Sequence, residues 1–293
     1  MRIVRTLAEL DALLRSSDRP GGVMVPTMGA LHEGHAALVR QAAALAQHRG
    51  IEAGCVVTIF VNPAQFDESH DYERYPRVLD EDAAACAEAG ARTIIAPTVE
   101  MVYPDGVEAA GPPVPAVGVG KGLEDEYRPG HFEGVAKVLA RLFAMAPPAA
   151  AIFGEKDYQQ LRLAGDLVRQ QRLDIDVVPG PTVRDADGLA LSSRNRFLSP
   201  EQRRAAGAIP RALRAASEEP TLADAEAAMR RTLAGLDINY ATVRDAGTLE
   251  PLPGGTRAGE APARALVTCR LGDTRLLDNA PWPLPSDSPL RCP

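Results

Sequence analysis

Short apolar runs alternate with helical stretches along the first 180 residues, and this alternation constrains the fold more than any other feature. The run at 55–61 reads Cys-Val-Val-Thr-Ile-Phe-Val and stops at Asn62-Pro63. An unbroken run of this kind suits a strand covered on both faces, as in a parallel sheet. Similar runs lie at 23–25, 92–96, 150–153 and 175–178, and helical stretches lie at 34–48, 79–89, 131–145 and 157–172. This order predicts an α/β fold with a Rossmann-like, doubly wound parallel sheet.

The composition changes near the Pro-Gly-Pro sequence at 179–181, which marks a candidate domain boundary. We therefore predict a first domain over 1–178 and a smaller α+β domain over 179–280. The second domain should contain helices at 199–216 and 221–235 and strands at 238–244, 263–271 and 274–278. The Pro-rich tail at 281–293 is expected to be disordered. A Pro- and Gly-rich loop at 104–120 is long enough to suggest a lid or an interface segment.

Composition and charge exclude several classes of protein. The 293 residues carry a net charge of −7 without a Lys/Arg-rich run, which argues against a nucleic-acid partner. The apolar stretch at 135–153 is broken by Lys137, Arg141 and a Pro-Pro pair, so no membrane span is expected. The four cysteines form no CxxC pair, and the N-terminus lacks the apolar core of a signal peptide. These features predict a reduced, cytoplasmic protein.

The most informative segment, at 26–35, reads Pro-Thr-Met-Gly-Ala-Leu-His-Glu-Gly-His. It follows the first predicted strand and opens the first long helix, whose N-terminus is suited to phosphate. Gly29 and Gly34 allow the backbone to approach a ligand closely. His32 and His35 are three residues apart, so both can present hydrogen-bond donors on one side of the helix start. A polar helix start or a weak metal-binding pair is the plainer interpretation, but the strand–loop–helix context favours a phosphate site.

A second candidate segment, Gly-Glu-Lys-Asp at 154–157, follows the fourth predicted strand and opens another helix. In a 3-2-1-4-5 strand order the first and fourth strands are neighbours, so the two helix starts would flank one crevice. Lys156 is one of only three lysines and offers a point charge for phosphate. Gln160 lies one turn further along and should face the same crevice. A solvated helix start is the alternative.

Three further groups of polar residues follow predicted strands or lie in polar loops. Gln65 follows the second strand and can both donate to and accept from a ligand that carries hydroxyls and a carboxylate. The loop residues Ser192, Ser193 and Arg194 could clamp a triphosphate, although a turn stabilised by serine hydroxyls is also possible. The acidic cluster at 80–82 could hold Mg²⁺, with Asp82 the better candidate, or could equally be a favourable acidic first turn of a helix.

The segment at 26–35 resembles the His-x-Gly-His signature of the adenylyl-transferring superfamily that includes class I aminoacyl-tRNA synthetases. The longer string around it is similar to that of the pantothenate synthetase family. The resemblance continues at 59–66, 75–77, 153–160 and 191–195, in the order of that family, and spans residues 1 to about 280.

This resemblance implies an enzyme that uses ATP to activate pantoate as an acyl-adenylate and then joins it to β-alanine. It implies Mg²⁺ as cofactor and a homodimer. By resemblance, pantoate and β-alanine contact Asn62, Gln65 and Gln160. The implied ATP-binding residues are Thr27, Met28, Gly29, Ala30, Leu31, His32, Glu33, Gly34, His35, Gly154, Glu155, Lys156, Asp157, Val183, Leu191, Ser192, Ser193 and Arg194. The implied catalytic donors are His32, His35, Lys156, Ser192, Ser193 and Arg194.

Two other functions share part of this pattern. An adenylyltransferase of the same superfamily would transfer AMP to a phosphate, but such enzymes do not carry the 62–66 and 154–160 segments together. A non-catalytic adenine-nucleotide sensor would bind ATP without needing the full set of phosphate donors. Pantoate-dependent release of pyrophosphate separates an enzyme from a sensor, and AMP formation with β-alanine separates a ligase from an adenylyltransferase.

Overall fold

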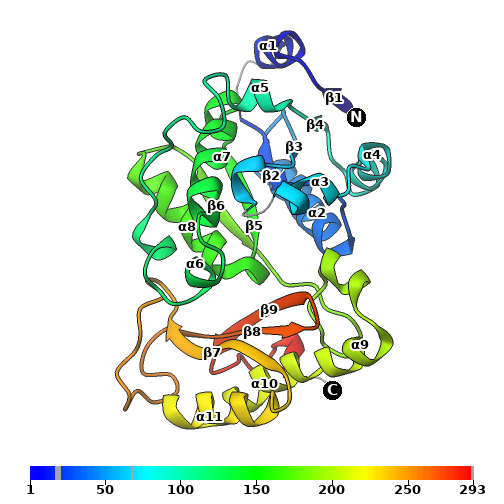
Figure 1. Cartoon of the computed structure of the whole chain (residues 1–293). Coiled ribbons are helices and arrows are strands. Elements are labelled where there is room, and N and C mark those ends of the chain that lie inside the picture. Colours follow the sequence, from blue (N-terminus) through cyan, green and yellow to red (C-terminus); the bar gives the residue numbers. More distant parts are fainter. Residues whose placement is uncertain (17–20, 67–68, 292–293) are drawn as a thin grey trace. The chain divides into compact units, whose positions relative to one another are not determined.

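The computed structural model describes residues 1–16, 21–66 and 69–291, and the chain forms two compact units (Figure 1). The first unit contains residues 1–154 and 160–181, and the second contains residues 155–159 and 182–293. The main division, at 181/182, lies close to the boundary predicted from composition. The short segment 155–159 was not predicted to belong with the second unit.

A six-stranded parallel sheet forms the centre of the first unit. Its order is β1-β4-β3-β2-β5-β6, so β2 and β5 are neighbours as predicted. The strands are β1 (Arg2–Val4), β2 (Val23–Thr27), β3 (Cys55–Ile59), β4 (Thr93–Ile95), β5 (Ala150–Gly154) and β6 (Asp176–Gly180). Strand β1 was not predicted from the sequence, because three residues at a sheet edge leave no apolar run to detect.

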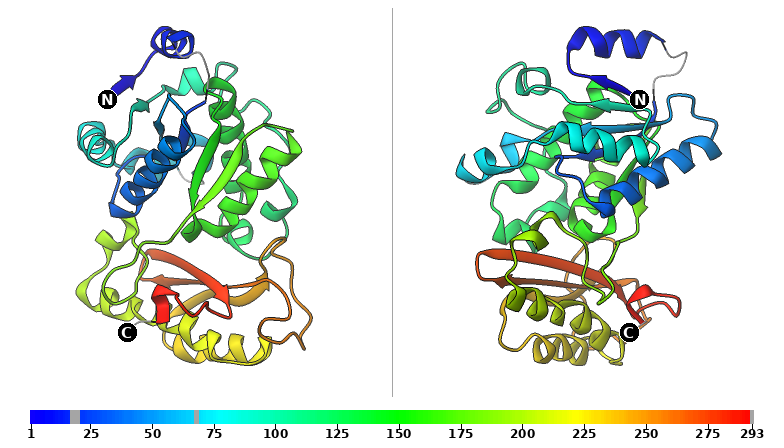
Figure 2. Two further views of the ribbon diagram at one scale, coloured as in Figure 1. Left: turned by 180° about the vertical axis from the view of Figure 1, so that it is seen from behind. Right: turned by 90° about the vertical axis from the view of Figure 1, so that its right-hand side faces the viewer.

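Helices cover both faces of this sheet. Figures 1 and 2 show α2 (Glu33–His48) and α4 (Leu79–Glu88) on one face and α7 (His131–Met145) and α8 (Tyr158–Gln170) on the other. The buried residues of α2, Val39, Ala42 and Ala46, are three and four positions apart and pack on β2, β3 and β5. The shorter helices are α1 (Leu7–Ser16), α3 (Ser69–Arg74), α5 (Val99–Val102) and α6 (Glu124–Tyr127).

The long loop at 104–120 packs on the first unit's own helices. The Lys137 ammonium of α7 donates to the Val107 carbonyl, and the Gln170 amide of α8 donates to the Pro113 carbonyl. Gly118 lies so close to α8 that an added Cβ would be 2.8 Å from a methyl carbon of Leu163. These contacts hold the loop against α7 and α8.

The second unit is an antiparallel sheet packed against helices. Strands β7 (Asp237–Asp245), β8 (Ala263–Leu271) and β9 (Thr274–Trp282) pair in that order. Alternate residues of β8 join a core that also contains residues of α10 (Ala208–Ser217) and α11 (Leu222–Thr232). The single helix predicted at 199–216 is in fact two, α9 (Pro200–Ala206) and α10, which meet at Gly207.

The prediction of a disordered tail is wrong for residues 281–291, whereas 292–293 lie outside the described residues. Strand β9 continues to Trp282, whose indole Nε1 donates to the Ala216 carbonyl. Leu284 and Leu290 are buried in the core of the second unit. The prediction gave more weight to proline content than to these two leucines, although each provides apolar area for packing.

Within the part of the chain that the structure describes, none of the helices is both long and apolar enough to cross a bilayer. Three cysteines, Cys55, Cys86 and Cys269, are free and buried. Burial raises the pKa of the Cys55 thiol to about 12, so this thiol stays protonated and unreactive at neutral pH.

We predict that Leu284→Ala lowers the free energy of unfolding of the second unit by about 2–4 kcal/mol, because it leaves a cavity in a packed core. Trp282 is the only tryptophan in the chain and lies in this unit, so its fluorescence during urea unfolding reports on this unit alone. The exposed Asp273→Ala is the matched control and should not shift the midpoint. Equal midpoints for the two variants would mean that the tail does not stabilise the unit.

Candidate active site

The loop between β2 and α2 has a backbone that few residues can adopt. Gly29 has φ +87° and Ala30 has φ +52°, both in the left-handed region. A Cβ at position 29 would also lie 2.9 Å from the Oδ2 atom of Asp82. Glycine is therefore required at position 29 by conformation and by space.

Asp82 holds this loop in place. Its Oδ2 accepts from the Ala30 N–H at 3.0 Å, and its Oδ1 accepts from the Leu31 N–H at 2.7 Å. The carboxylate lies in the first turn of α4 and is only 3% exposed. The structure thus gives Asp82 a structural role at this loop. No group of three or more metal-binding side chains occurs among the described residues.

The two histidines form a capping box at the start of α2. His32 is the N-cap residue, and its Nδ1 accepts from the Gly34 N–H at 3.1 Å. The Nδ1 of His35 accepts from the His32 N–H at 3.3 Å, and the two ring centroids are 4.1 Å apart. A nitrogen that accepts carries no proton, so the proton of each neutral ring is on Nε2. The backbone therefore sets the tautomer of both histidines.

The remaining expected residues of this loop lie around the histidines. The Thr27 hydroxyl donates to the Thr58 carbonyl at 2.8 Å and accepts from the Gly29 N–H, which ties the end of β2 to β3. The Tyr75 hydroxyl donates to the Gly29 carbonyl at 3.4 Å. Met28 is half-buried, and Glu33 is exposed and pairs with Arg40.

Asn62 supports Gln65 from a buried position. Its Nδ2 donates to the Gln65 Oε1 at 2.9 Å and to the Gly134 carbonyl at 3.1 Å. Its Oδ1 accepts from the Ala64 N–H and, at 2.6 Å, from the Tyr103 hydroxyl. Asn62 is 1% exposed and both of its polar side-chain atoms are bonded, while its implied contact with pantoate or β-alanine stays a prediction. Gln65 is half-buried, and because its oxygen is held by Asn62, its Nε2 carries the donors suited to a ligand.

Tyr103 and Gly134 shape this turn from behind. Burial raises the pKa of Tyr103 well above its usual range, so its hydroxyl remains a donor to Asn62. A Cβ added to Gly134 of α7 would lie 2.1 Å from the Ala64 carbonyl oxygen. Only glycine allows α7 to approach the turn η1 (Pro63–Gln65) this closely.

The His-containing loop, the Gln65 turn and Gly154 meet at one edge of the sheet. Parallel pairing aligns Thr27 with Ile59 across β2 and β3, and β5, which ends at Gly154, pairs with the other side of β2. Gln160 lies half-buried in α8 and returns the chain to the first unit. The juxtaposition predicted for the ends of β2, β3 and β5 is thus present.

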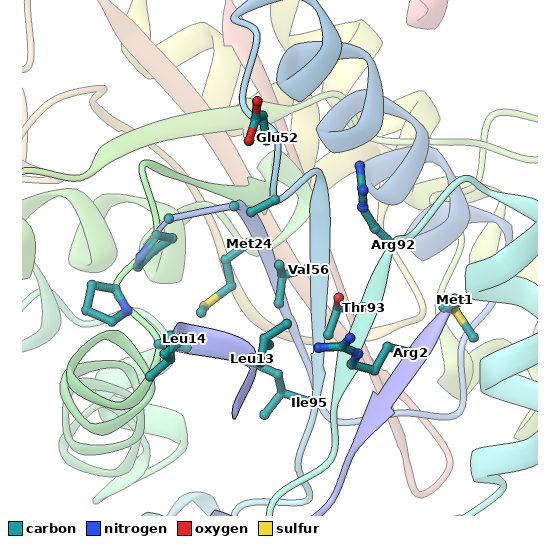
Figure 3. A pocket seen from close by; sticks show the side chains of 16 residues that line it. Met1, Arg2, Leu13, Leu14, Met24, Glu52, Val56, Arg92, Thr93 and Ile95 are labelled. Carbon is teal, nitrogen blue, oxygen red and sulfur yellow. The ribbon is translucent and has the colours of Figure 1, made fainter. Parts of the chain in front are cut away.

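A different cavity lies at the opposite, amino ends of these strands. Its volume is about 460 Å³, and Figure 3 shows Met24, Val56 and Ile95 of the sheet beside Leu13 and Leu14 of α1. None of the expected site residues lines it.

The turn that contains Lys156 packs with the second unit. The 3-10 turn η3 (Glu155–Asp157) directly follows β5. The Asn279 Nδ2 donates to the carbonyls of Glu155 at 3.0 Å and Lys156 at 2.7 Å. The Lys156 ammonium is 3.6 Å from the carboxylate of the exposed Asp157.

The Ser-Ser-Arg loop follows a short hairpin in the same unit. The Leu191 N–H donates to the Val183 carbonyl at 2.9 Å, which brings together two residues expected near ATP. Ser192 is the N-cap of η4 (Ser193–Phe197) and its Oγ accepts from the Arg194 N–H at 3.3 Å. Arg194 is exposed, so its guanidinium can reach an anion.

A bidentate ion pair fixes the base of this hairpin. Arg184 donates to both oxygens of Asp278, at 2.6 and 2.9 Å, and both side chains are nearly buried. On the exposed side, Arg203 pairs with Asp185 and Asp187 and holds the pKa of Asp187 below its usual value. None of these residues stood out in the sequence, because their partners are distant along the chain.

The polar residues described in the first unit and those described in the second unit each suit charge stabilisation at a polyphosphate. The first unit provides imidazole and amide donors, and the second provides an ammonium, a guanidinium and two hydroxyls. Within the described part of the chain, neither Ser192 nor Ser193 hydrogen-bonds to a basic side chain, so the set offers positioning and donors in place of a covalent nucleophile.

The chain matches a known protein family and is similar in sequence to known proteins. Residues 2–281 match the family described as pantoate-beta-alanine ligase. A pantothenate synthetase of Rubrobacter xylanophilus is 46% identical over 97% of this chain and 98% of its own. A pantothenate synthetase of a Nocardioides species is 45% identical over 98% of this chain and 87% of its own.

Solved structures agree with this similarity. A crystal structure of pantothenate synthetase from Thermus thermophilus has a TM-score of 0.83 and 42% identity, with 97% of this chain and 100% of that chain covered. A pantoate-beta-alanine ligase from Francisella tularensis, complexed with beta-gamma ATP and beta-alanine, has a TM-score of 0.75, with 30% identity over 95% of this chain and 97% of that chain. The chain therefore belongs to the pantoate-beta-alanine ligase family.

Proposed function

We propose that the chain joins pantoate to β-alanine at the expense of ATP, with AMP and pyrophosphate as the other products and pantoyl-adenylate as the intermediate. The observation that carries this proposal is the histidine capping box. It sets the Nε2–H tautomer of both His32 and His35 at a helix start beside the Gln65 turn. The Francisella tularensis relative was solved in complex with beta-gamma ATP and beta-alanine, which supports the same substrates here.

In the first half-reaction, the pantoate carboxylate attacks the α-phosphorus of ATP and pyrophosphate leaves. Transfers of this type depend on positioning and on donors aimed at the charge that develops on phosphate oxygens. His32 and His35 would donate from Nε2, and His35 is our candidate for donation toward the leaving group. Lys156, Ser192, Ser193 and Arg194 would bind the departing pyrophosphate, while Gln65 and Gln160 would hold pantoate.

In the second half-reaction, the amine of β-alanine attacks the acyl carbon of the adenylate, the C–O bond to the phosphate breaks and AMP leaves. The mixed anhydride would hydrolyse in open water, so the site must exclude water while it exists. We assign this role to the second unit, which carries the cationic residues and would act as a lid.

Mg²⁺ would enter as part of the nucleotide substrate. Both oxygens of Asp82 already accept backbone N–H groups, and the described residues offer no three-ligand cluster, so they do not fit a protein-held ion. The phosphates and water would supply the ligands instead. Chelation of Mg²⁺ should therefore stop turnover without lowering the thermal unfolding midpoint of the free protein, which calorimetry would check.

Two properties of the molecule in the cell belong to the same proposal. We assign it to the cytoplasm, where the three buried thiols of the described part would stay reduced. We also assign it a homodimeric state on family resemblance, which light scattering coupled to gel filtration would measure.

One assay tests the function directly. The protein is incubated with ATP, Mg²⁺, pantoate and β-alanine, and pantothenate, AMP and pyrophosphate are measured together. Pyrophosphate release that needs pantoate, and AMP release that needs β-alanine, support the ligase. Transfer of AMP to a phosphate acceptor, or ATP binding without turnover, would refute it.

We predict that His35→Ala and Lys156→Ala each lower kcat/KM by roughly 10²-fold, because each removes one donor to the transition state. Pantoate-dependent pyrophosphate release provides the measurement. The exposed His48→Ala is the control for loss of an imidazole. Turnover close to that of the unchanged protein in either variant would remove that residue from the mechanism.

We predict that Asp82→Asn lowers the free energy of unfolding by about 1–3 kcal/mol and impairs turnover, because one loop N–H loses its acceptor. Asp80→Asn is the matched control, since Asp80 is an exposed acid in the same helical turn. Unfolding and activity are measured for both variants. If excess Mg²⁺ restored turnover in the Asp82→Asn variant, Asp82 would instead be identified as a metal ligand.

A further inference from the structure

Two consecutive buried polar residues on β9 hold both candidate phosphate-binding segments of the second unit. Asp278 and Asn279 are each 2% exposed. Successive residues of a strand point to opposite faces of its sheet. Asp278 pairs in register with the core residue Val267, whereas Asn279 pairs with Leu266 on the opposite face. The two side chains therefore bond to different segments.

Asn279 fixes the Lys156 turn through the backbone. Its Nδ2 donates to two consecutive carbonyls, those of Glu155 and Lys156. Its Oδ1 accepts from the Arg264 Nε at 2.6 Å. Both polar atoms of the amide are bonded, and a satisfied buried network of this kind is rigid.

Arg264 strengthens the same attachment. Its guanidinium lies 4.0 Å from the ring centroid of Tyr158 and 3.5 Å from the Glu155 carboxylate. The Tyr158 hydroxyl in turn donates to the Ala246 carbonyl at 2.8 Å. The five residues 155–159 are thus attached to the second unit on both sides of Lys156, although the chain before and after them belongs to the first unit.

Asp278 fixes the other segment through Arg184. The guanidinium of Arg184 also donates to the Gly188 carbonyl at 3.0 Å, so it spans the hairpin whose ends, Val183 and Leu191, lead to Ser192. The Asn279 N–H donates to the Asp278 Oδ1 at 2.8 Å, which links the two attachments.

We propose that Asn279 is a positioning residue for Lys156, and that the Asp278-Asn279 pair keeps the Lys156 turn in register with the Ser-Ser-Arg loop. This inference rests on the proposed function, since it assigns both segments to one triphosphate. In physical terms, one strand sets the spacing between the ammonium and the guanidinium, so the cationic set acts as a single rigid group.

The test is a double-mutant cycle with Asn279→Ala and Lys156→Ala. Asn279→Ala should lower kcat for pantoate-dependent pyrophosphate release by about 10-fold or more and raise the KM for ATP, since small misplacement of a positioned group is costly. The KM for pantoate should stay within about twofold, because its proposed ligands are in the first unit. In the Lys156→Ala background, adding Asn279→Ala should lower kcat little further, because the ammonium that Asn279 positions is already missing.

Thr242→Val is the matched control. It removes a part-buried hydrogen bond in the same unit, from the Thr242 hydroxyl to Glu226, two strands across the sheet from Asn279. It should leave kcat and the KM for ATP unchanged. Asn279→Asp, which keeps the size and the Arg264 contact but places an oxygen against two carbonyls, repeats the test if Asn279→Ala does not fold. ATP affinity by calorimetry completes the cycle where turnover is too slow to measure.

Two outcomes would overturn the inference and leave Asn279 as an ordinary stabilising residue. One is that the decreases in kcat from Asn279→Ala and Lys156→Ala add up in the double variant. The other is that Thr242→Val lowers kcat as much as Asn279→Ala does. A wild-type chain that makes no pantothenate would instead overturn the proposed function, so the two failures are distinguishable.

Discussion

The carboxylate of Asp82 is the interaction on which the site in the first unit depends. It reaches from the start of α4 to two backbone N–H groups of the loop after β2. That loop turns through two left-handed residues, and without an acceptor its N–H groups would be buried and unsatisfied. By fixing the loop, Asp82 fixes where α2 begins, and the start of α2 determines the positions of His32 and His35.

The two units contribute different chemistry to the proposed reaction. The first provides neutral donors, the imidazoles and the Gln65 amide, on the edge of a rigid parallel sheet. The second provides the positive charge, on segments fixed to β9. In the proposed reaction, such a division would separate recognition of the acid substrate from stabilisation of the leaving group.

The sequence was sufficient for five of the six strands of the parallel sheet and for the principal motifs, because apolar runs, helix periodicity and the His32–His35 spacing are local signals. The hydrogen bonds of Asp82, Asn62 and Asn279 could not be predicted, because their partners lie up to 124 residues away along the chain. A hydrogen bond between residues so far apart in the chain leaves no pattern in the local sequence. The ordered tail was missed for a related reason. Leu284 and Leu290 pack against core residues that are distant in the sequence, so the tail's own sequence does not indicate their burial.

A capping box is commonly built from a serine or threonine and a glutamate, whereas this one uses two imidazoles. A second proton on either ring would convert its accepting Nδ1 into a donor and set it against a backbone N–H. A doubly protonated ring would therefore weaken the capping box and place a positive charge at the start of α2. In this helix, the geometry of the first turn and the protonation state of the two rings are coupled.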